Sequence, residues 1–133
     1  MTDYASAADA FAAMDAAHAE VRSRLSALAY AVPGSRAFTG SVLADLDRHA
    51  ARRAALRRRL GLGPARAPQV VPDEPRSLEA LRAAQERLVY AHAEGLPAIG
   101  DASAVDTLAH DMVDLSRHLT VTTLWLEVEA ERG

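Results

Sequence analysis

The sequence predicts an all-α fold, in which one domain spanning residues 1–133 forms a bundle of four long helices. Apolar residues make up 50% of the chain and aromatic residues only 5%, with alanine the most frequent type. Alanine favours helices, whereas sheets depend on β-branched and aromatic residues. In four stretches the apolar residues recur every three or four positions, which is the period of an amphipathic helix. Glycine and proline separate these stretches, and both residue types end helices.

The first helix is expected from residue 5 to residue 31. It ends at Val32, because Pro33 disfavours helical dihedral angles in the residue before it. A 3-4-3-4-3 spacing places six side chains on one face: Phe11, Met14, His18, Val21, Leu25 and Leu28. His18 alone among them is polar, and an unpaired buried polar group costs about 1–3 kcal/mol. We therefore expect other helices to supply partners for His18.

The second and third helices are expected at residues 40–60 and 78–94. Thr39 or Ser41 caps the second and Ser77 caps the third, because hydroxyl side chains accept hydrogen bonds from the first free backbone N–H groups. Each helix ends in a turn that contains glycine and proline. One face of the second helix carries Val42, Leu46, His49, Arg53, Leu56 and Leu60. One face of the third carries Leu78, Leu81, Gln85, Leu88 and His92.

The fourth helix is expected at residues 103–130. Its N-cap is Asp101 or Ser103, and Ser103 forms a capping-box-like pair with Asp106. One face carries Val105, Leu108, Met112, Leu115, Leu119, Thr122 and Leu126. A second stripe beside it carries Asp111, Asp114, His118, Val121, Trp125 and Val128. The segment from Leu119 to Val128 is apolar nearly all round, which is typical of a helix buried on more than one side.

The segment between the second and third helices, residues 61–76, indicates how the helices connect. It contains four prolines and no helical periodicity. Sixteen extended residues reach up to about 50 Å, whereas a helix of 22 residues is about 33 Å long. The segment can therefore cross the full length of the bundle. Two antiparallel hairpins joined by one long crossover form the ferritin-like connectivity.

Three histidines lie near the midpoints of their helices: His18, His49 and His118. In-register packing would place them in one polar layer of the core, with Gln85 or Glu86 at the same height and His92 about two turns away. Each of the three follows an aspartate by three or four residues, a spacing that puts both side chains on one helix face. Such a pair can supply two metal ligands, a ligand oriented by a carboxylate, or a hydrogen bond that satisfies a core histidine.

The chain resembles a known group at these positions. The central His18, the run His-x-x-Arg-Arg-x-x-Leu from His49 to Leu56, the proline-rich crossover and the apolar last helix with Trp125 resemble the ferritin-like four-helix domains of unknown function found in actinobacteria. The wider superfamily implies a di-iron or di-manganese centre built from glutamates and Glu-x-x-His motifs. This sequence contains no Glu-x-x-His. This departure leaves two alternatives: a histidine-richer site for a single iron, manganese or zinc ion, or a bundle that has lost its metal.

The function we expect from the sequence is metal binding at mid-bundle, with metal-dependent redox chemistry as the class if the protein is an enzyme. The expected ligands are His18, His49, Asp114, His118, Asp45 and Glu20. Arg53 and His92 are candidates for binding a small ligand in the core, and Arg53 is also expected to neutralise a buried carboxylate such as Asp114. The alternative is a non-catalytic bundle that binds a protein or a small ligand and has a structural polar layer. No Gly-rich loop or nucleophile motif indicates an organic cofactor.

Charge and composition restrict the partners. The net charge is −3, there is no cysteine, and no apolar run approaches bilayer length. We therefore expect a cytoplasmic protein that binds neither nucleic acid nor membrane. Except for Arg53, the arginines from Arg48 to Arg59 of the second helix are expected to pair with Glu127, Glu129 and Glu131, with a phosphate-binding stripe as the alternative. The last helix is expected to form a homodimer through Val121, Trp125 and Val128, unless Val70 and Val71 of the crossover cover it.

Overall fold

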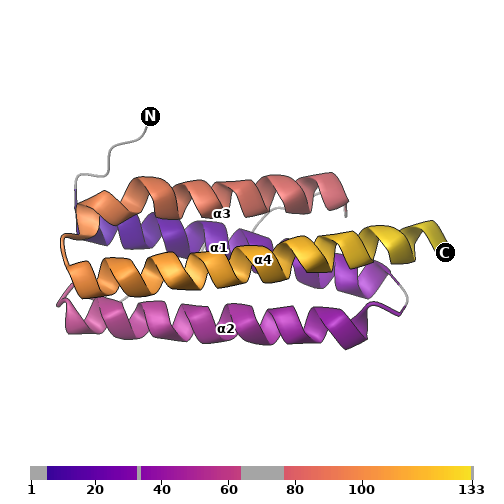
Figure 1. The fold of residues 1–133 in the computed structure, drawn as a ribbon, viewed down its shortest axis with the longest axis horizontal. Helices are drawn as coiled ribbons and strands as arrows, with labels where there is room; N and C mark the ends of the chain where they lie inside the picture. The colour runs from indigo at the N-terminus through magenta and orange to yellow at the C-terminus, as the bar shows by residue number, and fades with distance from the viewer. Residues whose placement is uncertain (1–5, 33, 64–76, 133) are drawn as a thin grey trace.

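A computed structural model describes residues 6–32, 34–63 and 77–132. These residues form four helices and no strand: α1 (Ala7–Ala31), α2 (Arg36–Arg59), α3 (Leu78–Ile99) and α4 (Ala102–Arg132) (Figure 1). The all-α, four-helix prediction is confirmed. Within the described residues, no helix combines the length and the apolar character that a bilayer span requires.

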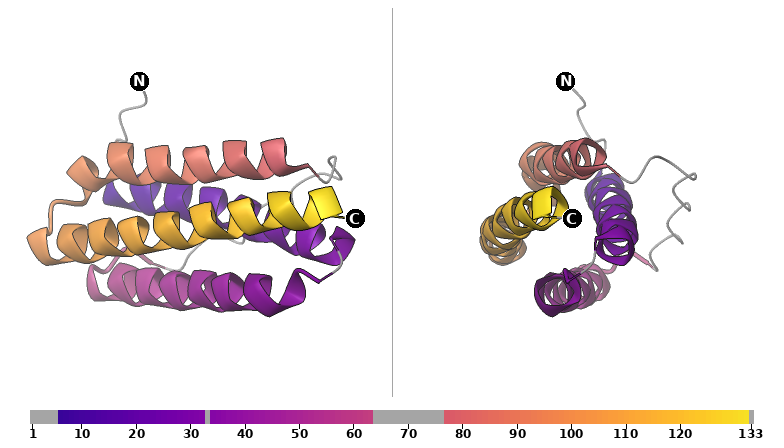
Figure 2. Two further views of the ribbon diagram at one scale, coloured as in Figure 1. Left: turned by 45° about the vertical axis from the view of Figure 1, so that its right-hand side comes forward. Right: turned by 90° about the vertical axis from the view of Figure 1, so that its right-hand side faces the viewer.

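The helices pack as a bundle in which α1 and α4 run in one direction and α2 and α3 in the other (Figure 1). Both α1 and α4 contact α2 and α3, so α1 lies diagonally across from α4 (Figure 2, right). Every neighbouring pair is therefore antiparallel. The end of α2 and the start of α3 lie at opposite ends of the bundle (Figure 1). Most of the predicted crossover, residues 64–76, and with it Val70 and Val71, lies outside the described residues.

The turn between α1 and α2 differs from the prediction at one end. α1 begins with Ser6 as N-cap and ends with Val32 in an extended conformation, as expected. α2 begins at Arg36, so neither Thr39 nor Ser41 is the cap. Thr39 lies inside the helix and its hydroxyl donates to the Ser35 carbonyl at 2.9 Å. The earlier start follows from Gly34, whose positive φ of 83° reverses the chain within a few residues.

The predicted end of α3 at residue 94 is wrong, because the helix continues through Gly95 and Pro97 to Ile99. Gly95 is needed for packing rather than for a turn. A Cβ there would lie 3.2 Å from the Cβ of Ala10 in α1. The buried Ile99 holds the last turn against the core, and the helix stops at Gly100, whose φ is 73°.

The start of α4 decides between the two predicted caps. Asp101 is the cap, since its carboxylate accepts a hydrogen bond from the Ala104 N–H at 2.9 Å. Ser103 lies within the helix, so the predicted pair of Ser103 and Asp106 is not the capping device.

The apolar core consists of two clusters. The larger surrounds Val21, Leu25, Leu46, Leu88 and Leu119. The smaller lies toward the start of α1 and contains Phe11, Met14, Ala91, Ile99 and Leu108. All six residues of the predicted α1 face are buried. His18 lies between the α1 residues of the two clusters, so a polar layer divides the core where the sequence placed a histidine.

Candidate functional site

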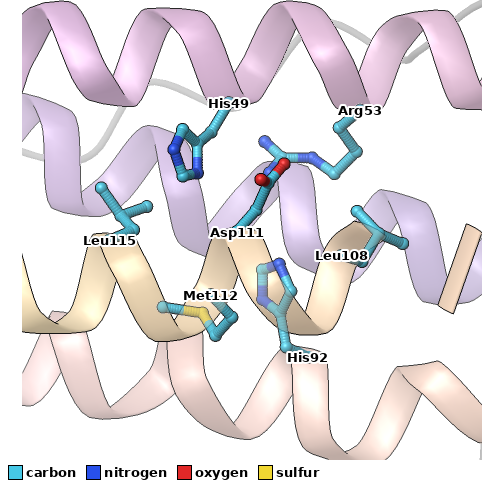
Figure 3. A pocket seen from close by; sticks show the side chains of 7 residues that line it. All are labelled: His49, Arg53, His92, Leu108, Asp111, Met112 and Leu115. Atoms are coloured by element: carbon cyan, nitrogen blue, oxygen red, sulfur yellow. The ribbon is translucent and has the colours of Figure 1, made fainter. Parts of the chain in front are cut away.

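A small cavity of about 10 Å³ lies in this polar layer (Figure 3). It is lined by His49, Arg53, His92, Leu108, Asp111, Met112 and Leu115. His49 reaches from α2 and His92 from α3 toward Asp111 of α4 (Figure 3). The volume suits a water molecule or a small ion. The cavity therefore brings two imidazoles and one carboxylate from three helices around a space of atomic size.

His49 is held at one ring nitrogen and free at the other. Its Nε2 lies 3.3 Å from Oδ1 of Asp45, one turn earlier in α2. A carboxylate accepts hydrogen bonds, so Nε2 carries the proton and Nδ1 the lone pair. Nδ1 is buried and has no hydrogen-bond partner among the described residues. Burial lowers the pKa of His49, while the negative charges of Asp111 and Asp114 oppose the shift.

His92 is fixed in the same way by the backbone. Its Nδ1 donates to the Leu88 carbonyl at 2.9 Å, which leaves the lone pair on Nε2. Burial lowers the pKa of His92 to about 4, with a further contribution from the positive charge of Arg53. The imidazole is therefore neutral at physiological pH and can accept a proton or coordinate a cation.

Asp111 completes the cavity from α4. Its Oδ1 accepts a hydrogen bond from Nη1 of Arg52 at 2.5 Å. Its Oδ2 is buried and, within the described part of the chain, has no partner. His49, His92 and Asp111 are thus each positioned by a group that does not line the cavity: Asp45, the Leu88 carbonyl and Arg52.

His18 lies close to these groups but does not line the cavity. Neither ring nitrogen makes a hydrogen bond with a described residue. Burial lowers the pKa of His18 to about 3, assisted by Arg53, His92 and His49, and a weaker polar contact with the Leu46 backbone opposes the shift. Because charges on three other residues act on it, His18 belongs to the same polar layer.

Arg53 has a different partner from the predicted one. The side chain is buried, and its Nε donates to Oδ1 of Asp15 in α1 at 2.5 Å. Asp114, the carboxylate expected to neutralise it, is exposed on α4. The pair of Arg53 and Asp15 therefore joins α2 to α1 and removes most of the net charge from this side of the layer.

Three of the six ligands expected from the sequence meet, since Asp45 contacts both His49 and His118, whereas Asp114 and Glu20 lie elsewhere. His118 is half-buried and its Nδ1 donates to Oδ2 of Asp45 at 3.1 Å, outside the cavity. Asp114 faces solvent, and Glu20 pairs with Arg87 across α1 and α3. Among the described residues, no three histidine, aspartate or glutamate side chains approach closely enough to hold an ion as they stand.

The composition of the layer is corrected accordingly. His92 lines the cavity with His49, although the sequence placed it two turns away, and His118 does not. Gln85 is absent from the layer, because its side chain bonds Thr120 in a surface groove. Asp111 was placed on the second stripe of the last helix but given no role. Arg52 is the feature of the sequence that could have indicated Asp111. A buried aspartate needs a cation nearby, and Arg52 lies beside Arg53 on the helix that faces Asp111.

Two arginines of α2 pair with carboxylates at the start or in the first half of α4, not at its end. Arg52 contacts Asp111, and Arg59 lies 3.4 Å from Asp101. Glu127 instead pairs with Arg82 of α3 at 2.8 Å. The predicted pairing is wrong because α2 and α4 are antiparallel, which places the C-terminal arginines of α2 beside the N-terminal turns of α4.

Comparisons with protein-family models, curated proteins and solved structures found no match for this chain. The resemblance to the actinobacterial ferritin-like domains stays a prediction.

Proposed function

We propose that this protein binds one transition-metal ion in the polar layer, with His49, His92 and Asp111 as ligands. One observation carries the proposal: these three side chains, each from a different helix, line a single cavity. Within the described residues, Nδ1 of His49 and Oδ2 of Asp111 are buried without a hydrogen-bond partner. Leaving such groups unpaired costs about 1–3 kcal/mol each. Coordination to a cation would satisfy both.

The neighbours of the three side chains support this assignment. A metal-bound histidine usually donates its other ring N–H to a carboxylate or a backbone carbonyl, and this fixes its tautomer. The Leu88 carbonyl accepts from His92 in this way, and the Asp45 carboxylate lies 3.3 Å from Nε2 of His49, in position to accept its proton. The lowered pKa values keep both rings neutral, so no proton has to leave when a metal binds. As the described residues stand, the three side chains are too far apart to coordinate one ion, so binding would require them to draw together around it.

Two histidines and one carboxylate suit iron, manganese or zinc. Iron or manganese would supply redox or oxygen chemistry, whereas zinc would supply Lewis-acid chemistry alone. The dinuclear centre of the ferritin-like superfamily does not fit these residues, because Asp111 is the one carboxylate that lines the cavity. We therefore propose a ferritin-like connectivity with a site for a single ion. The connectivity is supported by the helix directions, since α1 and α4 run one way and α2 and α3 the other (Figure 1).

The test is metal content by plasma mass spectrometry on untagged protein after separate incubation with Fe(II), Mn(II) and Zn(II). We expect about one equivalent of one metal per chain. Asp111→Asn keeps the shape of the side chain, and His49→Ala removes a ligand; both should abolish stoichiometric binding. His118→Ala and His110→Ala should retain it, since His118 lies outside the cavity and His110 is exposed on α4.

Circular dichroism of each variant separates loss of metal from loss of fold. Folded Asp111→Asn and His49→Ala proteins that still bind one equivalent would refute the proposed ligands. A wild-type protein without stoichiometric metal under every condition would refute metal binding itself.

A second candidate function is a non-catalytic bundle that binds another protein, with a polar layer that fixes the register of the helices. The observation that favours it is the exposed apolar surface of α4, where Val121, Leu124 and Trp125 are each about half exposed. Under this function His49→Ala would lower thermal stability without any effect on metal content, and metal content therefore distinguishes the two candidates.

A further inference from the structure

The second half of α4 exposes a row of large apolar side chains. The exposed fractions are 51% for Val121, 55% for Leu124, 51% for Trp125 and 41% for Val128. Their spacing places them on one face of the helix, which we call the outer face of α4. Among the described helices α4 contacts α2 and α3 (Figure 2, right), and neither of them buries these four side chains. Contiguous apolar surface of this kind marks an interaction site.

The outer face is held in place by the fold. The ring of Trp125 packs against Phe38 of α2, with ring centroids 6.2 Å apart. The opposite side of α4, with Leu119 and Leu126, is fully buried in the core. The exposed side chains therefore project from a rigid helix, and a partner would not have to order them on binding.

We infer that the outer face of α4 binds the same face of a second copy of this chain, with the two helices antiparallel. The charges that flank the row support this partner. Arg117 lies seven residues before Leu124 and Glu131 seven residues after it, so each is about 10 Å from the centre, on nearly the same side of the helix. A twofold axis at Leu124 would place Arg117 of each copy opposite Glu131 of the other. A parallel pair would instead place like charges together.

A groove between α3 and α4 extends this surface. It has a volume of about 460 Å³ and is lined by Arg82, Gln85, Glu86, Val89, Tyr90, Thr120 and Thr123. Thr120 directly precedes Val121 and Thr123 directly precedes Leu124 on α4, and Tyr90 is 63% exposed on α3. The four apolar residues of the row fall short of the roughly 800 Å² that each partner buries in a typical stable complex. The groove adds the remaining contact, and we expect a dimer that depends on protein concentration.

Sedimentation equilibrium over a range of concentrations tests the dimer. Wild-type protein should associate to twice the chain mass, and Trp125→Glu or Leu124→Glu should weaken association by at least about tenfold, because a buried unpaired carboxylate is unfavourable. Val113→Glu is the matched control: Val113 is 50% exposed on α4 but lies outside the row, so its dimer should persist. A wild-type monomer at all concentrations, or a dimer that survives both glutamate substitutions, would overturn the inference.

Charge reversal tests the antiparallel orientation. Arg117→Glu and Glu131→Arg should each weaken the dimer by several-fold, and the double variant should recover it, because opposite charges then face each other again. If the double variant weakens the dimer by as much as the two single substitutions together, the pairing of Arg117 with Glu131 is excluded.

Cysteine cross-linking gives a second measure of orientation, and the chain has no cysteine of its own. A disulfide needs Cα atoms within about 7 Å. Leu124→Cys lies on the proposed axis and should cross-link to its copy. Val121→Cys should not, because an antiparallel arrangement separates it from its copy by about 9 Å along the helix axis. Efficient cross-linking of Val121→Cys would indicate a parallel dimer and refute the proposed geometry.

Discussion

The burial of His18 predicts that this protein loses stability under mildly acidic conditions. In the unfolded chain His18 should titrate near its ordinary pKa of 6.5, whereas burial and the positive charge of Arg53 lower its pKa in the folded protein to about 3. Between these values the unfolded state binds more protons than the folded state, so stability falls as the pH falls. The stability that the folded protein has while His18 is neutral in both states is present above about pH 6.5, and it is lost progressively as the pH falls toward 3.

The magnitude follows from the pKa difference. One pH unit below 6.5 is worth about 1.4 kcal/mol for one such group, so His18 alone should reduce the free energy of unfolding by about 2 kcal/mol at pH 5. His92, with its pKa lowered to about 4, adds to the loss. His18→Leu isolates the first contribution: its free energy of unfolding should fall by about 2 kcal/mol less than that of the wild type between pH 7.5 and pH 5.

Urea unfolding followed by circular dichroism, with a chelator present, measures both quantities. At pH 7.5 the His18→Leu protein should also be more stable than the wild type by about 1–3 kcal/mol, because the substitution removes two buried nitrogens that make no hydrogen bond with a described residue. His110→Leu, at an exposed position, serves as the control and should leave the acid loss of the wild type in place. The reasoning fails if wild-type stability is equal at pH 7.5 and pH 5, or if His18→Leu shows the same loss as the wild type.

Three further predictions concern the fold. Gly40→Ala should raise the free energy of unfolding by about 0.5–1 kcal/mol, because the added Cβ meets nothing within 4 Å and alanine favours the helix. Gly95→Ala should lower it by about 1 kcal/mol, because its Cβ would lie 3.0 Å from Cε of Met14. Equal effects of the two substitutions in urea unfolding would contradict this. Asp101→Ala should cost about 1 kcal/mol through loss of the α4 cap, and an unchanged midpoint would show that Asp101 does not act as a cap. Leu119→Ala should cost about 2–5 kcal/mol, because the side chain is fully buried; a cost below 1 kcal/mol would mean that the core repacks.

Local pattern was sufficient for the elements and the core faces. The four helices and the buried face of α1 were predicted from spacing alone, because a helix of this length must bury one apolar stripe. Helix ends were predicted where a side chain or proline acts on its own neighbours, as at Ser77 and Val32. The prediction failed at Gly95, where the glycine serves a contact with another helix rather than a turn.

The candidate site depended on information that no local pattern contains. The sequence predicted a polar layer with His18 and His49, since each lies on a buried helix face. It could not predict that His92 and Asp111 complete the cavity. The axial offset of α3 decides whether His92 reaches the layer, and the offset and rotation of α4 decide whether Asp111 or Asp114 faces it.

The sequence by itself therefore determined the helical fold, the buried stripes and the presence of histidines in the core. Only the tertiary structure decided which histidines meet, that Arg53 pairs with Asp15, and that the apolar end of α4 faces outward in the described chain. The physical reason is that helix periodicity fixes the direction of each side chain around its own axis, whereas the register between helices is set by close packing at points such as Gly95 against α1.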